Sequence, residues 1–171
     1  MSHSAPGDLR RLAEKVGGIL AERCETVATA ESCTAGLVAA TLTRSPGSSD
    51  FFWGGTVVYA AGAKVELGGL DPELLEEHGT VSATTTEALA EAIRDRSTAT
   101  YGVAVTGWAG PTAGQGEAVG RIFVAVANHR GVVSRRWDFE GDRDAVRAAA
   151  VGAVLELLRQ QLAGSEDGAD D

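Results

Sequence analysis

The chain has few of the residues that build disulfide frameworks and metal sites. Its 171 residues include two cysteines, Cys24 and Cys33, which are too few for a disulfide framework. The three histidines, His3, His78 and His129, lie too far apart to match a metal-ligand spacing. We therefore expect a reduced, cytoplasmic domain that uses neither a metal nor a cofactor.

Signals for membrane insertion and export are also absent, and positive charge is scarce. No apolar run is long enough to cross a bilayer, and the first residues lack the basic-then-apolar pattern of a signal peptide. The net charge of -9 at pH 7 opposes binding to a nucleic-acid backbone. We expect neither a nucleic-acid partner nor a membrane partner.

The length fits one domain with a single core. An apolar content of 44% and a charged content of 23% are typical of a globular protein. We place the domain at residues 8–162, with flexible termini at residues 1–7 and 163–171, the second of which is acidic. We expect copies of the chain to form a homo-oligomer, although no residue pattern specifies how many.

Hydrophobic periodicity predicts helices and strands in alternation along most of the chain. The expected helices lie at residues 8–22, about 35–45, 61–67, from 71 onward, 82–96 and 141–162. The first expected strand begins at about residue 26, and the others lie at 51–59, 101–106, 121–127 and 132–139.

This order of elements predicts an α/β fold. Helices separate the first three strands, which implies parallel pairing, and a tight turn joins the last two strands, which implies an antiparallel edge. We expect a single three-layer α/β/α domain with a mixed, mostly parallel five-stranded sheet. Sites in such sheets form beyond the carboxyl ends of the strands, and Ser32, Tyr59 and Thr106 each stand at such an end.

Ser32 is the first candidate for chemistry, since it stands between an expected strand and an expected helix. Unpaired N–H groups at the start of a helix can bind an anion or stabilise an oxyanion. A serine nucleophile needs a base, and Lys64 lies in an apolar stretch where burial would lower its pKa. From the residues alone, a helix cap at Ser32 and a solvated Lys64 are the commoner arrangements. Cys33 is a rival nucleophile, although without a nearby base it is better interpreted as a small buried residue.

Three further features surround this pair in the expected fold. Tyr59 could orient Lys64 or a substrate, or could be a half-buried aromatic of the strand. The Gly-rich stretch after Thr106 could hold a phosphate or carboxylate, although it matches no P-loop pattern, and Trp108 could stack on a ring or cover the core. Arg143 and Arg147, one helical turn apart, could clamp a phosphate or could form a solvated helix face.

Five motifs in this order resemble the CinA C-terminal-domain family, whose standalone members include bacterial nicotinamide-nucleotide amidases. The first motif matches the family pattern Ala-Glu-Ser-Cys-Thr-Gly-Gly with one change, Ala35 for glycine. The resemblance extends from Leu9 to Leu162. The motifs are Ala-Glu-Ser-Cys-Thr-Ala-Gly at 30–36, Pro-Gly-Ser-Ser at 46–49, His-Gly-Thr-Val-Ser at 78–82, Thr-Gly-Trp-Ala-Gly-Pro at 106–111 and Gly-Asp-Arg-Asp-Ala-Val-Arg at 141–147.

The resemblance implies hydrolysis of nicotinamide mononucleotide (NMN) to nicotinic acid mononucleotide and ammonia, with a small nucleotide as the partner and no metal. It implies Ser32 as nucleophile and Lys64 as base, with Tyr59 beside them. The remaining residues would bind the substrate: N–H groups near Thr34, Ala35 and Gly36 would hold the oxyanion, and Thr106, Gly107, Gly110, Arg143 and Arg147 would hold the nucleotide and its phosphate.

The chain departs from the family next to the lysine. The family often has Tyr-Ser-Asn-x-x-Lys where this chain has Tyr59-Ala60-Ala61-Gly62-Ala63-Lys64, so two polar side chains are missing. This departure favours an alternative function, a non-catalytic pyridine-nucleotide-binding module of the same fold. A general amidase or esterase with another small substrate is a third possibility.

Overall fold

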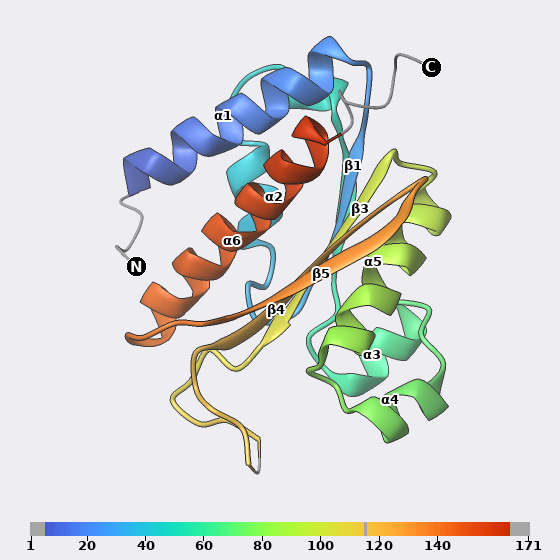
Figure 1. The fold of residues 1–171 in the computed structure, drawn as a ribbon, viewed down its shortest axis with the longest axis vertical. Helices are drawn as coiled ribbons and strands as arrows, with labels where there is room; N and C mark the ends of the chain where they lie inside the picture. The colour runs from blue at the N-terminus through green and yellow to red at the C-terminus, as the bar shows by residue number, and fades with distance from the viewer. Residues whose placement is uncertain (1–5, 115, 165–171) are drawn as a thin grey trace.

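The computed structural model describes residues 6–114 and 116–164 (Figure 1). Of the termini expected to be flexible, residues 1–5 and 165–171 lie outside the described residues, whereas residues 6, 7 and 163 belong to terminal helices. The helices are α1 (Pro6–Glu22), α2 (Leu37–Leu42), α3 (Ala61–Glu66), α4 (Pro72–His78), α5 (Ala83–Ser97) and α6 (Arg143–Ala163), with a 3-10 turn at Ser48–Asp50. The strands are β1 (Val27–Glu31), β2 (Phe52–Val57), β3 (Tyr101–Gly107), β4 (Arg121–Asn128) and β5 (Gly131–Asp138).

The strands form one mixed sheet in the order β2-β1-β3-β4-β5. The β1–β2 and β1–β3 pairs are parallel, whereas the β3–β4 and β4–β5 pairs are antiparallel. Four strands therefore run in one direction and β4 runs against them. The predicted mixed sheet with an antiparallel pair at one edge is confirmed.

Helices cover both faces of the sheet, as predicted for three layers. Figure 1 shows α1, α2 and α6 on one side of the sheet and α3, α4 and α5 on the other. Large residues of β3 and β4, such as Val103 and Val124, belong to the core under α1 and α6, while Ala104 and Ala125 face α5. The small residues let α5 approach closely: a Cβ on Gly102 would lie 2.1 Å from the Ala90 carbonyl oxygen.

The helix after β1 begins later and is shorter than the sequence pattern predicts. We expected it to begin near Ala35 and end near Ser45, but α2 spans only Leu37–Leu42. Ala35 and Gly36 adopt left-handed conformations, with φ of 49° and 93°. This backbone forms a tight turn between β1 and α2, and Ser32 lies at the start of that turn.

Candidate active site

The segments that follow β1, β2 and β3 converge with the first turn of α6 around a cleft of about 260 Å³. This is the edge of the sheet where the sequence predicts a site. The cleft is lined by Ser32, Cys33, Tyr59, Lys64, Thr80, Val81, Gly107, Trp108, Ala109, Gly110, Thr112 and Arg143.

Backbone hydrogen bonds fix the peptides on both sides of Ser32. The Ser32 N–H donates to the Val105 carbonyl at 3.0 Å, and the Glu31 carbonyl accepts from the Val58 N–H at 2.8 Å. These bonds continue the pairing of β1 with β3 and with β2. The hydroxyl of Ser32 is thereby held at the junction of three strands, and the residue is only 6% exposed.

Lys64 reaches the same point from α3. Its Nζ lies 3.3 Å from Ser32 Oγ, 2.9 Å from the Val58 carbonyl oxygen and 3.3 Å from the Tyr59 carbonyl oxygen. The residue is 1% exposed. Burial lowers the pKa of Lys64 from its ordinary value of 10.5, an effect that the neighbouring Cys33 opposes more weakly.

The contacts of Lys64 suit a neutral amine. A neutral amine has two N–H donors and one lone pair. If Lys64 is neutral, its two N–H groups donate to the two backbone carbonyls, and its lone pair can accept the proton of the Ser32 hydroxyl. This is the arrangement that a serine nucleophile and its general base require.

Glu31, and not Ser32, caps α2. Its carboxylate accepts hydrogen bonds from the N–H groups of Gly36 at 2.9 Å, Val38 at 3.0 Å and Ala39 at 2.8 Å. The interpretation of Ser32 as a helix cap is therefore wrong, because the carboxylate of the preceding residue already fills the helix terminus. The Ser32 hydroxyl is left for the contact with Lys64.

This capping changes which N–H groups could meet an oxyanion. The Gly36 N–H donates to Glu31, and the Ala35 N–H donates to the Ser32 carbonyl at 3.0 Å. Within the described ranges the N–H groups of Cys33 and Thr34 donate to no oxygen acceptor, and both lower the pKa of the nearby Cys33 thiol. They are the donors available beside Ser32.

Cys33 lines the cleft but is poorly suited to attack. Burial raises the pKa of its thiol to about 11, against the opposing effect of the two N–H groups. A thiol with this pKa is protonated at neutral pH and is a weak nucleophile. Cys33 is a small buried residue, as its sequence context indicated.

Arg143 connects two of the converging loops. Its Nη2 donates to Tyr59 Oη at 2.9 Å, and its Nη1 donates to the Gly110 carbonyl at 2.6 Å. Tyr59 is 55% exposed and meets Lys64 through its backbone carbonyl rather than its ring. Arg143 and the tyrosine hydroxyl thus form one polar wall of the cleft.

Arg147 lies behind the turn that contains Ser32. Its Nε donates to the Cys33 carbonyl at 3.2 Å and its Nη2 to the Thr34 carbonyl at 2.9 Å. It does not line the cleft. The structure therefore does not bring Arg147 together with Arg143 on one ligand-facing surface.

Thr106 is also away from the cleft. It is fully buried, and its Oγ1 lies 2.8 Å from Thr86 Oγ1 on α5. Because Thr86 Oγ1 donates its proton to the Ser82 carbonyl, Thr106 is the donor of this pair. Its hydroxyl ties the end of β3 to the start of α5.

Six of the predicted site residues line the cleft, and five do not. Ser32, Tyr59, Lys64, Gly107, Gly110 and Arg143 line it, while Thr34, Ala35, Gly36, Thr106 and Arg147 surround the Ser32 turn or lie beneath it. Thr80, Val81, Ala109 and Thr112 also line it, and sequence reasoning named none of them individually, although Ala109 and Thr112 belong to the Gly-rich stretch that it expected to hold a ligand. The motif at residues 78–82 was the available signal for the first two.

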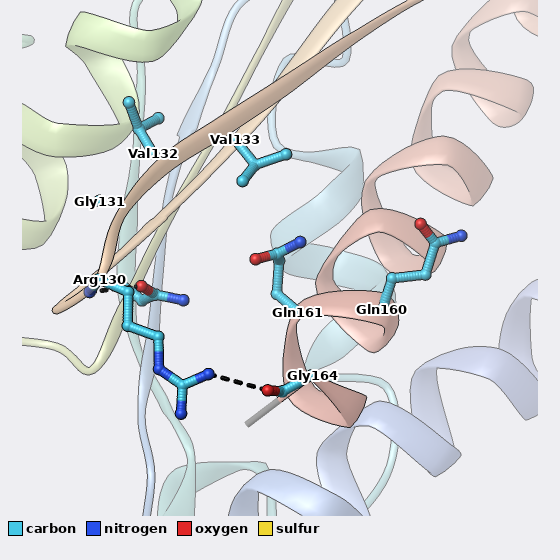
Figure 2. A pocket seen from close by; sticks show the side chains of 8 residues that line it. Arg130, Gly131, Val132, Val133, Gln160, Gln161 and Gly164 are labelled. Atoms are coloured by element: carbon cyan, nitrogen blue, oxygen red, sulfur yellow. Dashed lines mark hydrogen bonds between the residues drawn. The ribbon is translucent and has the colours of Figure 1, made fainter. Parts of the chain in front are cut away.

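A second, smaller pocket lies at the opposite end of the sheet (Figure 2). Its volume is about 140 Å³, and it lies between the β4–β5 turn and the end of α6. Arg130 Nη1 donates to the Gly164 carbonyl at 2.8 Å across it. None of the residues that line this pocket is a serine, cysteine, lysine or carboxylate, so we assign it no chemistry.

The described part of the chain offers neither a metal cluster nor a membrane-spanning helix. No group of three or more His, Cys, Asp or Glu side chains there could hold a metal ion. No helix among the same residues is long and apolar enough to cross a membrane.

Comparison with known proteins assigns the chain to a family. A family model described as the CinA C-terminal domain matches residues 9–162. A CinA-like protein of Myxococcus xanthus is 48% identical over 140 residues, which are 80% of this chain and 33% of that protein. A CinA-like protein of Synechocystis sp. is 42% identical over 158 residues, which are 90% of this chain and 38% of that protein. The chain thus spans only 33% and 38% of the length of these two relatives.

Solved structures agree with the sequence comparison and are similar over most of their length. The competence/damage inducible protein of Agrobacterium tumefaciens is 36% identical with a TM-score of 0.88, over 94% of this chain and 98% of that one. The competence damage-inducible protein A of Klebsiella pneumoniae is 30% identical with a TM-score of 0.88, over 91% and 97%. The chain belongs to the CinA C-terminal domain family.

Proposed function

We propose that the chain is an amidohydrolase in which Ser32 attacks the carbonyl carbon of a carboxamide and Lys64 acts as general base. One observation carries the proposal: a buried lysine whose nitrogen lies 3.3 Å from a serine hydroxyl and donates to two backbone carbonyls. The lowered pKa of Lys64 favours the neutral form that a base needs.

The reaction proceeds in two halves. The Ser32 hydroxyl gives its proton to Lys64 as its oxygen bonds to the carboxamide carbon, and the N–H groups of Cys33 and Thr34 stabilise the oxyanion. Lys64 then returns the proton to the leaving nitrogen, which departs as ammonia and leaves an ester on Ser32. Water gives a proton to Lys64 as its oxygen bonds to the ester carbon, the bond from that carbon to Ser32 Oγ breaks, and Lys64 returns the proton to Oγ as the carboxylic acid is released.

We further propose NMN as the substrate, as the motifs imply. The cleft offers features that suit a phosphorylated pyridine nucleoside. Arg143 supplies a positive charge at the rim, Trp108 supplies an aromatic surface, and the chain from Gly107 to Gly110 supplies backbone groups. No step of this reaction needs a metal or a cofactor.

The test is to incubate the protein with NMN and to measure ammonia and nicotinic acid mononucleotide. Ser32→Ala and Lys64→Met should each lower kcat by about 10⁴-fold or more. Lys15→Met removes the other lysine of the chain, which is exposed on α1, and should leave the rate unchanged. Circular dichroism of each variant checks that the fold is retained.

Three outcomes would lead to other conclusions. Absence of ammonia from the wild type, or equal rates in all variants, would overturn the amidase proposal. Saturable NMN binding that Ser32→Ala leaves unchanged, without turnover, would support the non-catalytic binding module that the missing polar groups at Ala60 and Ala61 favour. Equal turnover of simple amides with and without a phosphate would indicate a general amidase.

A further inference from the structure

We infer that Arg147 is a positioning residue that holds the turn after Ser32 and strengthens its oxyanion donors, and that it does not bind the substrate phosphate. The inference rests on the proposed function, because it concerns the transition state of that reaction. It also revises the role that the sequence motifs imply for Arg147.

Two of the three nitrogens of the Arg147 guanidinium donate hydrogen bonds to the protein backbone, and the third lies near a carboxylate. Nε and Nη2 donate to the consecutive carbonyls of Cys33 and Thr34, at 3.2 Å and 2.9 Å. Nη1 lies 3.7 Å from Asp144 Oδ1. The planar fork of an arginine can meet two adjacent carbonyls at once, whereas a lysine offers a single point of charge. A phosphate could use these donors only by displacing the two carbonyls, which lie on the side of the turn away from the cleft.

One of the two carbonyls belongs to a peptide group that supplies an N–H donor beside the nucleophile, and the other belongs to the peptide group that closes the turn. The Cys33 carbonyl and the Thr34 N–H form one peptide group, and a hydrogen bond to its oxygen polarises its N–H into a stronger donor. The Thr34 carbonyl shares its peptide with the Ala35 N–H, which closes the turn on the Ser32 carbonyl at 3.0 Å. Arg147 therefore polarises the peptide group between Cys33 and Thr34, and it fixes the turn through the peptide group between Thr34 and Ala35.

Arg143 provides the contrast on the same helix. It lies one turn earlier, lines the cleft and donates to Tyr59 Oη and the Gly110 carbonyl. A substrate phosphate in the cleft can meet Arg143 directly, whereas Arg147 can reach the reacting atoms only through the peptides of the turn. The two arginines should therefore have different kinetic signatures.

The test compares Arg147→Gln, Arg147→Lys and Arg143→Gln, with NMN and with nicotinamide riboside, which lacks the phosphate. Arg147→Gln should lower kcat by about 10²-fold for both substrates, as expected when an oxyanion donor is weakened, and should leave KM within about twofold. Arg147→Lys should restore part of kcat. Arg143→Gln should raise KM for NMN more than for the riboside.

The matched control is Arg159→Gln, which removes an arginine of similar exposure farther along α6. The Arg159 side chain is 33% exposed against 27% for Arg147, and it pairs with Glu156. Its variant should keep the wild-type kcat and KM. An Arg147→Gln variant that raises KM for NMN alone, or that keeps the wild-type kcat, would overturn the inference.

A fluorophosphonate probe separates failure of this inference from failure of the proposed substrate, because its reaction with Ser32 needs the oxyanion donors but not NMN. Wild type that is labelled without hydrolysing NMN would overturn the substrate proposal alone, and Arg147→Gln should then be labelled about 10²-fold more slowly. Equal labelling rates in the two proteins would overturn the role of Arg147. Wild type that is neither labelled nor active would overturn both proposals.

Discussion

Lys64 Nζ lies 2.9 Å from the carbonyl oxygen of Val58, closer than the 3.3 Å that separates it from Ser32 Oγ. The backbone of the segment after β2, and not the serine, therefore supplies the shorter contact that holds the amine. The backbone carbonyls therefore hold Lys64 in place by contacts that do not involve the Ser32 proton. This relationship allows predictions about the charge of Lys64 that do not depend on the identity of the substrate.

The rate should depend on pH through the neutral form of Lys64. Because burial lowers the pKa of Lys64 from 10.5, kcat should rise with pH, with its midpoint below that value. This rise should be visible when kcat is measured between about pH 5 and about pH 10. A profile without an acidic limb, or one whose limb is centred at the ordinary lysine value, would contradict the assignment of Lys64 as base.

The free energy of unfolding should rise with pH on account of the same residue. The pKa of Lys64 is lower in the folded protein than in the unfolded chain, so the unfolded state binds more protons between the two values. The contribution of Lys64 to the free energy of unfolding is therefore fully present above the pKa that the residue has in the unfolded chain. It is lost as the pH falls through the lower pKa that the residue has in the folded protein. Urea denaturation should show wild type gaining stability relative to Lys64→Met as pH is raised from neutral. Lys15→Met should track wild type, and parallel curves for Lys64→Met would contradict the prediction.

Replacing Glu31 by glutamine should destabilise the fold. The carboxylate accepts three N–H groups, two at Oε2 and one at Oε1. An amide can replace one of these oxygens, but its NH₂ would then face an N–H donor, and the unpaired groups should lower the free energy of unfolding by about 1–3 kcal/mol. Denaturation in urea measures this change. The exposed Glu76→Gln should change stability by less than about 0.5 kcal/mol, and an equally small effect at Glu31 would show that the cap contributes little.

Ligand binding should change the fluorescence of Trp108. Trp108 lines the cleft, and its Nε1 is buried without a hydrogen-bond partner in the described part of the chain. A bound nucleotide would alter the surroundings of the indole, so titration with NMN should give a saturable change in emission. Trp108→Phe should abolish the change, whereas Trp53→Phe, which removes a 56% exposed indole, should retain it. A signal that survives Trp108→Phe would locate binding elsewhere.

The proximity of Ser32 and Lys64 could be expected from the sequence. Both residues follow strands that an alternating pattern makes parallel, and parallel strands end at one edge of the sheet. The apolar stretch around Lys64 allowed a buried amine, although from the residues alone a solvated lysine was the commoner arrangement. The fold class followed from the same order of elements, because periodicity alone separates strands from helices over most of this chain.

The roles of Glu31, Thr106 and Arg147 could not be predicted in the same way. Glu31 caps a helix that begins six residues later, across a turn whose left-handed residues the apolar pattern does not reveal. Thr106 lies near the end of β3 but points to α5, because side chains alternate between the faces of a sheet. Arg147 shares a helix face with Arg143, and only the packing of α6 places one behind the turn and the other in the cleft.

The hydrogen bond from Arg147 to Thr34 joins residues 113 positions apart, and that from Arg143 to Tyr59 joins residues 84 apart. The nucleophile is therefore fastened from the last helix of the described chain, and no shorter N-terminal piece contains all of its supports. Synthesis must reach α6, and α6 must dock, before the turn after Ser32 has its full set of contacts. Turnover would then be a property of the whole cooperative unit, and its loss during denaturation would coincide with the loss of helix and sheet rather than precede it.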